Sequence, residues 1–192
     1  MEKLTGLRKV KTAVFISGTG SNLKSIIKFS KIKKSPIAVN LIVSNTRLAK
    51  GLKYADQFKI KKKIFNLQDY NENEKNILIS LKKEKIKFIC LAGYMKILSN
   101  KFIKKFDGKI INIHPSLLPK YKGLNTHSRV IKNKDKLSGC TVHYVTAKLD
   151  SGKIILQKKV KISANDNSVS LKKKVLKQEH KLYPAAIEKI FN

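Results

Sequence analysis

Residues 12–22 set the pattern of this fold: Thr12-Ala13-Val14-Phe15-Ile16-Ser17 runs directly into Gly18-Thr19-Gly20-Ser21-Asn22. The first half is a β-prone apolar run, which predicts a strand. Leu23, Ile26 and Ile27 then recur at helical spacing, with Ser21 or Asn22 placed to cap the helix. The stretch therefore predicts a strand, a glycine turn and a helix.

The rest of the chain repeats this alternation. Further strands are expected over residues 37–43, 63–65, 88–91, 109–113, 141–145 and 154–160. Helices are expected over residues 48–58, 74–85, 102–106, 126–132 and 169–191, the last interrupted or bent near Pro184. Strands separated by helices predict a mostly parallel sheet, whereas the short link between the last two strands predicts an antiparallel pair. We therefore expect one doubly wound α/β domain over residues 1–192, with residues 1–11 as a loose N-terminal extension.

The chain is strongly basic, with 43 lysines and arginines against 12 acidic residues and a formal net charge of +31. All but three of these basic residues are lysine, and they are scattered along the whole sequence. A nucleic-acid reader usually concentrates charge on one element and adds arginines or stacking aromatics, which make up only 7% here. We expect a solvated basic surface without a specific nucleic-acid partner; a non-enzymatic polyanion-binding protein is the alternative.

Other features of the sequence limit the class of protein. Cys90 and Cys140 both lie inside apolar runs, which argues against a disulfide scaffold. No run approaches the roughly 20 apolar residues of a membrane span, and the basic first ten residues lack the apolar region of a signal peptide. We expect a cytoplasmic protein without a membrane partner.

The glycine turn is the first candidate binding site. In a doubly wound sheet, ligands bind at the carboxyl ends of the strands, and a helix N-terminus offers free amides to an anion. Leu23 stands where a dinucleotide fingerprint has its third glycine, so a monophosphate fits Gly20, Ser21 and Asn22 better than NAD or ATP. A merely tight strand-to-helix turn is the other interpretation.

The strand ending at His114 carries the candidate chemistry. Asn112 and His114 are two residues apart, so both side chains leave the same face of the strand. An amide donor beside an imidazole suits a developing oxyanion, with the imidazole also moving a proton. Asp150, in an Asp-Ser-Gly turn, is either a local turn former or a carboxylate partner that favours the protonated form of His114.

The remaining histidines and cysteines predict no further chemistry. His127, His143 and His180 have no metal-ligand spacing with each other or with the cysteines, so we expect no metal. Both cysteines are expected to be small core residues rather than nucleophiles. No Gly-x-Ser-x-Gly elbow is present, which argues against a covalent acyl-enzyme.

Several strings together resemble the phosphoribosylglycinamide formyltransferases, the folate-dependent formyltransferases of purine synthesis. They are residues 15–23, FISGTGSNL; 91–98, LAGYMKIL; 111–123, INIHPSLLPKYKG; and 145–152, VTAKLDSG, together with Gln178-Glu179-His180 and Tyr183-Pro184. The resemblance spans nearly the whole chain in order, and the Asn-x-His-Pro-Ser-Leu-Leu-Pro string is highly specific.

This resemblance implies a single formyltransferase domain with a Rossmann-like fold, as a monomer or homodimer. It also implies transfer of the formyl group of 10-formyltetrahydrofolate, the co-substrate, to the amine of glycinamide ribonucleotide. By analogy Asn112, His114 and Asp150 are catalytic, and Glu179 joins Gly20, Ser21 and Asn22 at the ribonucleotide. The folate pocket implied by the resemblance consists of Met95, Lys96, Ile97, Leu98, Asn112, Thr146, Ala147, Lys148, Leu149 and Asp150.

Three positions depart from the pattern of the resemblance. Lys96 stands where many relatives carry arginine, and Lys122 where proline is frequent. Residues 68–71, QDYN, lack the arginine that relatives place nearby against the folate, which leaves open how the folate tail is held, although a lysine could substitute. Two related enzymes are alternatives to this assignment. The nearest is formyltetrahydrofolate hydrolase, a family that usually adds an N-terminal regulatory domain, which we do not expect here. The other is methionyl-tRNA formyltransferase, which carries an extra C-terminal domain that we do not expect either.

Overall fold

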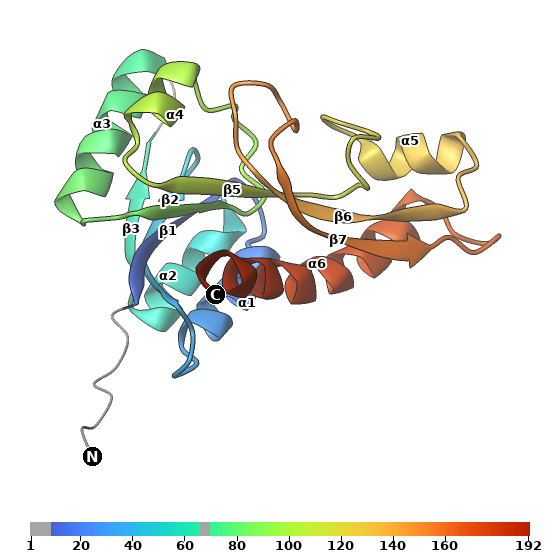
Figure 1. Ribbon diagram of the computed structural model, residues 1–192, viewed down its shortest axis with the longest axis horizontal. Coiled ribbons are helices and arrows are strands. Elements are labelled where there is room, and N and C mark those ends of the chain that lie inside the picture. Colours follow the sequence, from blue (N-terminus) through green and yellow to red (C-terminus); the bar gives the residue numbers. More distant parts are fainter. Residues whose placement is uncertain (1–8, 66–69) are drawn as a thin grey trace.

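The computed structural model describes residues 9–65 and 70–192, and it is built around a seven-stranded sheet (Figure 1). The strand order is β3-β2-β1-β4-β5-β6-β7. The strands are β1 (Val10–Ile16), β2 (Ile37–Ser44), β3 (Lys61–Ile64), β4 (Phe88–Leu91), β5 (Lys109–His114), β6 (Leu137–Tyr144) and β7 (Ile154–Lys161). The first five strands are parallel, while β6 runs antiparallel to both β5 and β7. The expected doubly wound, mostly parallel sheet with antiparallel C-terminal strands is confirmed.

Helices cover both faces of this sheet. They are α1 (Ser21–Ser30), the 3₁₀ helix η1 (Lys50–Leu52), α2 (Lys53–Phe58), α3 (Tyr70–Lys83), α4 (Asn100–Lys105), α5 (Thr126–Lys132) and α6 (Ser168–Phe191). In Figure 1, α3 and α4 lie on one face, with α1, α2 and α6 on the other. Ala13 and Phe15 of β1 belong to one apolar cluster, and Val14 and Ile16 belong to the other. This explains why the first strand is a continuous apolar run: both of its faces are buried.

The order of strands places a ligand site at the centre of the sheet. From β1 the chain winds outward to β2 and β3, and then returns to form β4 on the other side of β1. Such a reversal opens a crevice at the carboxyl ends of the two central strands. The glycine turn follows β1 and residues 92–98 follow β4, so both segments meet at this crevice.

Helix α6 continues through Pro184, which corrects the expected interruption. A proline within a helix leaves the carbonyl four residues earlier without its usual donor. That carbonyl belongs to His180, and it accepts a hydrogen bond from Ser25 Oγ of α1 at 2.6 Å. A side chain of the neighbouring helix thus replaces the missing backbone donor.

Several expected boundaries are wrong by a few residues. Strand β1 begins at Val10, so Val10 and Lys11 are not part of a loose extension, and residues 1–8 lie outside the described residues. Strand β6 begins at Leu137, four residues before the expected start, because its N-terminal half pairs with β7. Residues 48–58 do not form one helix: η1 and α2 begin only at Lys50 and Lys53.

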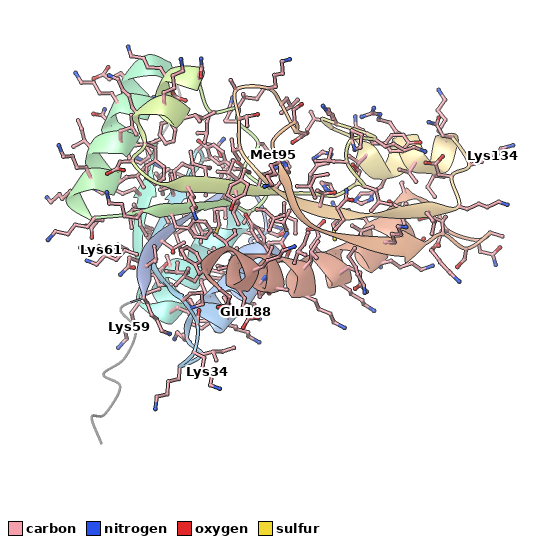
Figure 2. All side chains as sticks on the ribbon, viewed as in Figure 1. Lys34, Lys59, Lys61, Met95, Lys134 and Glu188 are labelled. Carbon is pink, nitrogen blue, oxygen red and sulfur yellow. The ribbon has the colours of Figure 1, made fainter. Side chains whose placement is uncertain are left out.

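The basic residues lie mainly on the outside of the fold. Figure 2 shows Lys34, Lys59, Lys61 and Lys134 extending away from the sheet and its covering helices. The two edge strands are also lysine-rich, with KKKI in β3 and IILQKKVK in β7. Within the described part of the chain, none of the helices combines the length and the apolar character that crossing a bilayer requires.

Candidate active site

A cavity of about 820 Å³ lies at the carboxyl ends of the central strands. Its lining includes residues 18–22 of the glycine turn and residues 91–98, together with Asn112 and His114. The lining is completed by the loop that leads into α5 together with the first residues of that helix, by the end of β6 with the loop that follows it, and by the N-terminal half of α6. A volume of this size suits small-molecule ligands, which typically occupy sites of about 300–1,000 Å³.

Asn112 and His114 lie on β5 and both face this cavity. Their register partners on β6 are His143 and Thr141. The side-chain amide nitrogen of Asn112 lies 3.3 Å from His143 Nε2, an interaction that fixes the amide. The strand spacing that predicted a shared face therefore places an amide and an imidazole side by side.

Both ring nitrogens of His114 face protein acceptors. Nε2 lies 2.8 Å from the Tyr121 carbonyl oxygen, and Nδ1 lies 3.3 Å from Asp150 Oδ2. The side chain is almost fully buried, at 6% exposure. Burial lowers the pKa of His114, although the Tyr121 carbonyl and the Asp150 charge both act to raise it. The expected effect of Asp150 is present, but loss of solvation outweighs it, so the net shift of the His114 pKa is downward.

Asp150 lies between two imidazoles. Its Oδ2 atom accepts a hydrogen bond from the Gly123 backbone N–H at 2.9 Å, and its Oδ1 atom lies 3.6 Å from His143 Nε2. Burial would raise the pKa of Asp150, but the nearby His143 ring, the hydrogen bond from the Gly123 N–H and the neighbouring His114 bring it below its usual value. The carboxylate is therefore ionised and fixed in position, which goes beyond the local turn role left open by the sequence.

His143 is the member of this cluster that sequence reasoning set aside. It contacts both Asn112 and Asp150 and is buried, and its Nδ1 lies 2.9 Å from the Tyr144 carbonyl oxygen. Its position follows from the antiparallel register of β5 and β6, which pairs His143 with Asn112. The sequence signal that could have indicated this role is strand alternation: His143 is a polar residue two positions after Thr141, so the two side chains share one face of an otherwise apolar strand.

The glycine turn packs tightly against η1. Gly20 has a left-handed φ of 74°, and a Cβ atom at this position would lie 2.6 Å from Gly51 Cα. The Gly51 N–H donates to the Gly18 carbonyl at 2.9 Å, holding the two segments together. Helix α1 begins at Ser21 without a side-chain cap, so the expected capping by Ser21 or Asn22 is wrong.

Asn22 is instead turned towards α6. Its Nδ2 atom donates to Glu179 Oε2 at 2.6 Å, and each of the two residues is only 7% exposed. Asn22 Oδ1 is buried and has no hydrogen-bond partner among the described residues. Burial raises the pKa of Glu179, and the hydrogen bond from Asn22 partly opposes this shift. The structure thus brings all four residues expected at the ribonucleotide to one end of the cavity.

The segment that follows β4 contributes apolar side chains to the cavity, and some of them are exposed. Met95 and Ile97 are 68% and 62% exposed, although Leu98 is buried. The residues of the expected folate pocket that line the cavity are Met95, Lys96, Ile97, Leu98, Asn112, Thr146, Lys148, Leu149 and Asp150. Ala147 is exposed and is not part of the lining. Of the segment 68–71, residues 68 and 69 and the side chains of residues 70 and 71 lie outside what the structure describes.

The remaining candidate residues lie apart from this chemistry. Cys90 and Cys140 are buried free thiols whose pKa values burial raises, to about 12 for Cys140. Among residues 9–65 and 70–192, no group of three or more His, Cys, Asp or Glu side chains could hold a metal ion.

Comparison with known proteins assigns this fold and site to a class. A family model described as formyl transferase matches residues 10–187, and the chain therefore belongs to the formyl transferase family. Phosphoribosylglycinamide formyltransferase of Haemophilus influenzae is 42% identical over 181 residues, covering 93% of this chain and 85% of the relative. The crystal structure of the Brucella melitensis phosphoribosylglycinamide formyltransferase has a TM-score of 0.90 at 39% identity, covering 95% of this chain and 96% of that one. Within the family, the chain falls among the phosphoribosylglycinamide formyltransferases.

Longer relatives contain the same unit. Trifunctional purine biosynthetic protein adenosine-3 of Gallus gallus is 40% identical over 183 residues. The match covers 94% of this chain, which spans only 18% of the length of that relative. In that protein the matching segment is therefore one part of a much longer chain.

Proposed function

We propose that this protein transfers the formyl group of 10-formyltetrahydrofolate to the amine of glycinamide ribonucleotide. The observation that carries the proposal is the cluster of Asn112, His114 and Asp150 in the wall of one cavity. The same wall holds the glycine turn, whose backbone amides suit a phosphate, and exposed apolar side chains that suit a flat ring system. We further propose that the chain acts as one formyltransferase domain in the cytoplasm, as a monomer or a homodimer.

The two substrates occupy opposite ends of the cavity in this proposal. The 5′-phosphate of the ribonucleotide lies at Gly20, Ser21 and Asn22, with Glu179 beside the sugar. The folate ring lies against Met95 to Leu98 and the loop of residues 146–150. The amine and the formyl carbon then meet beside His114. The protein thus promotes the reaction in part by holding the two reacting groups close together in the correct orientation.

The reaction forms a carbon–nitrogen bond to the amine and breaks the bond between the formyl carbon and the folate nitrogen. Attack by the neutral amine produces an oxyanion and a cationic nitrogen. Asn112 donates a fixed hydrogen bond to that oxygen. His114 assists in moving the proton from the attacking nitrogen to the departing folate nitrogen, and the fixed charge of Asp150 stabilises the imidazolium formed on the way.

The resting position of His114 adds one requirement. Its Nε2 atom faces the Tyr121 carbonyl, and its Nδ1 atom faces Asp150. To contact the substrate, Nε2 must therefore break its interaction with the Tyr121 carbonyl and form one with the substrate instead. The Asp150 contact is kept, because it stabilises the charged ring.

The deciding experiment measures formylated ribonucleotide and released tetrahydrofolate in the same reaction with purified protein. We expect the two products in equal amounts, and Asn112→Ala should lower turnover by about 10²–10³-fold, the typical effect of losing an oxyanion donor. Release of tetrahydrofolate without formylated ribonucleotide would instead identify a hydrolase. Absence of both products would refute the proposed function and favour the polyanion-binding alternative.

A further inference from the structure

One lysine of α6 lines the cavity. Lys172 is one of five α6 residues in the wall, and these share one face of the helix: Ser168, Val169, Lys172, Leu176 and Glu179. Lys174, two positions further, is bound to Asp166 at 2.5 Å. Lys172 makes no such ion pair with any residue in the described ranges. Its charge is therefore available to the cavity.

The glycine turn carries no cation of its own. Residues 18–22 contain no charged side chain, and Lys24, in the first turns of α1, lies over the Tyr54 ring, 5.6 Å from its centroid. The buried Glu179 carboxyl lies next to the turn through its hydrogen bond with Asn22. A phosphate here would meet backbone amides and a nearby acid, and the acid disfavours a second negative charge. A positive charge near both groups would offset this repulsion.

Lys172 lines the same cavity as the glycine turn and Glu179. It lies two helical turns from Glu179 on the same face, and its charge partly opposes the rise in the Glu179 pKa that burial causes. On the neighbouring α5, burial lowers the pKa of His127, and the Lys172 charge lowers it further. Two buried polar atoms in the cavity wall, Asn22 Oδ1 and His127 Nδ1, have no hydrogen-bond partner among the described residues. This end of the cavity thus combines a free cation with polar atoms that still lack partners.

We propose that Lys172 is the cation that neutralises the 5′-phosphate of the ribonucleotide bound at Gly20 to Asn22. The inference rests on the proposed function, because that function supplies the phosphate monoester. Lys172 acts by binding: it determines specificity for the phosphorylated substrate and takes no part in formyl transfer.

The test compares two ligands by calorimetry with the full chain: glycinamide ribonucleotide and its dephosphorylated riboside. Lys172→Gln should weaken ribonucleotide binding by about 10-fold, as expected for one partly exposed charge-assisted hydrogen bond, and leave riboside binding unchanged. Lys172→Arg should restore most of the affinity. Lys173→Gln is the matched control, because Lys173 is also exposed but does not line the cavity.

Kinetics provide the second measurement. Lys172→Gln should raise the KM for the ribonucleotide, with kcat and the KM for the folate unchanged, as expected for lost ground-state binding. If Lys172→Gln binds the ribonucleotide as tightly as the wild type does, this inference is wrong and the proposed function stands. Equal losses in Lys172→Gln and Lys173→Gln also overturn it, because they indicate a general effect of surface charge. A wild-type protein that binds neither ligand refutes the proposed function itself.

Discussion

Three glycines that line the cavity provide a graded test of how the glycine turn is held. Gly18 has an ordinary φ, and a Cβ atom there would meet nothing within 4 Å. Gly93 also has open space but adopts φ +75°. Gly20 combines φ +74° with a backbone contact of 2.6 Å to Gly51 Cα. Alanine should therefore introduce no strain at Gly18, backbone strain at Gly93, and both backbone strain and a steric clash at Gly20.

The magnitudes follow from these geometries. Gly18→Ala should leave the free energy of unfolding unchanged or raise it by about 0.5 kcal/mol, because alanine restricts the unfolded chain. Gly93→Ala should lower it by about 1–2 kcal/mol, the cost of a left-handed conformation. Gly20→Ala should lower it by about 2–5 kcal/mol, since a clash with backbone adds about 1–3 kcal/mol.

Urea unfolding followed by circular dichroism measures the three free energies by linear extrapolation. If Gly20→Ala costs no more than Gly93→Ala, the close contact between the glycine turn and η1 is not a constraint, and the reasoning fails. Gly51→Ala approaches the same contact from the opposite side, with its Cβ 2.8 Å from Gly20 Cα. It should raise the KM for the ribonucleotide much more than the KM for the folate.

Three further predictions concern the catalytic pair, the carboxylate of Asp166 and the surface charge. Asp150→Asn and His114→Ala should each reduce turnover severely, and the double variant should be little worse than the poorer single variant; a loss equal to the product of the two would show that they act independently. Lys174 and other donors hold the pKa of Asp166 at about 2, below its usual 3.8. The contribution of the Asp166 carboxylate to the free energy of unfolding is therefore complete above pH 3.8 and is lost as the pH falls through about 2. Urea unfolding across this range should therefore depend less on pH in Asp166→Asn than in the wild type. RNA binding should show no sequence preference and should weaken by about 10³-fold or more between ~50 and ~200 mM salt; tight binding of one RNA at physiological salt would contradict a merely solvated lysine surface.

Local patterns in the sequence were enough to predict the architecture and the shared face of two site residues. The apolar run before Gly18 predicts a buried central strand, and the two-residue spacing of Asn112 and His114 places both side chains on one face of β5. His143 was missed because its role depends on the register between β5 and β6. That register is a property of strand pairing and is not encoded in the spacing of neighbouring residues.

Long-range contacts were beyond the reach of local patterns. Asn22 and Glu179 are 157 positions apart, and only the resemblance suggested that they meet. The continuity of α6 through Pro184 likewise depends on Ser25, which lies 155 residues before the carbonyl that it caps. In both cases α1 and α6 supply the partner through tertiary packing, which no local periodicity reports.

The lysines of the two edge strands have a consequence for solubility. Open strand edges present unpaired backbone groups that can recruit another chain, and charged side chains, lysine above all, discourage such pairing. Residues 61–63 at one border of the sheet and Lys158, Lys159 and Lys161 at the other are all exposed. A second copy approaching edge to edge would bring like charges together before any backbone bond could form. The lysines of the two edge strands thus protect this chain from strand-mediated aggregation, a role that requires no anionic partner.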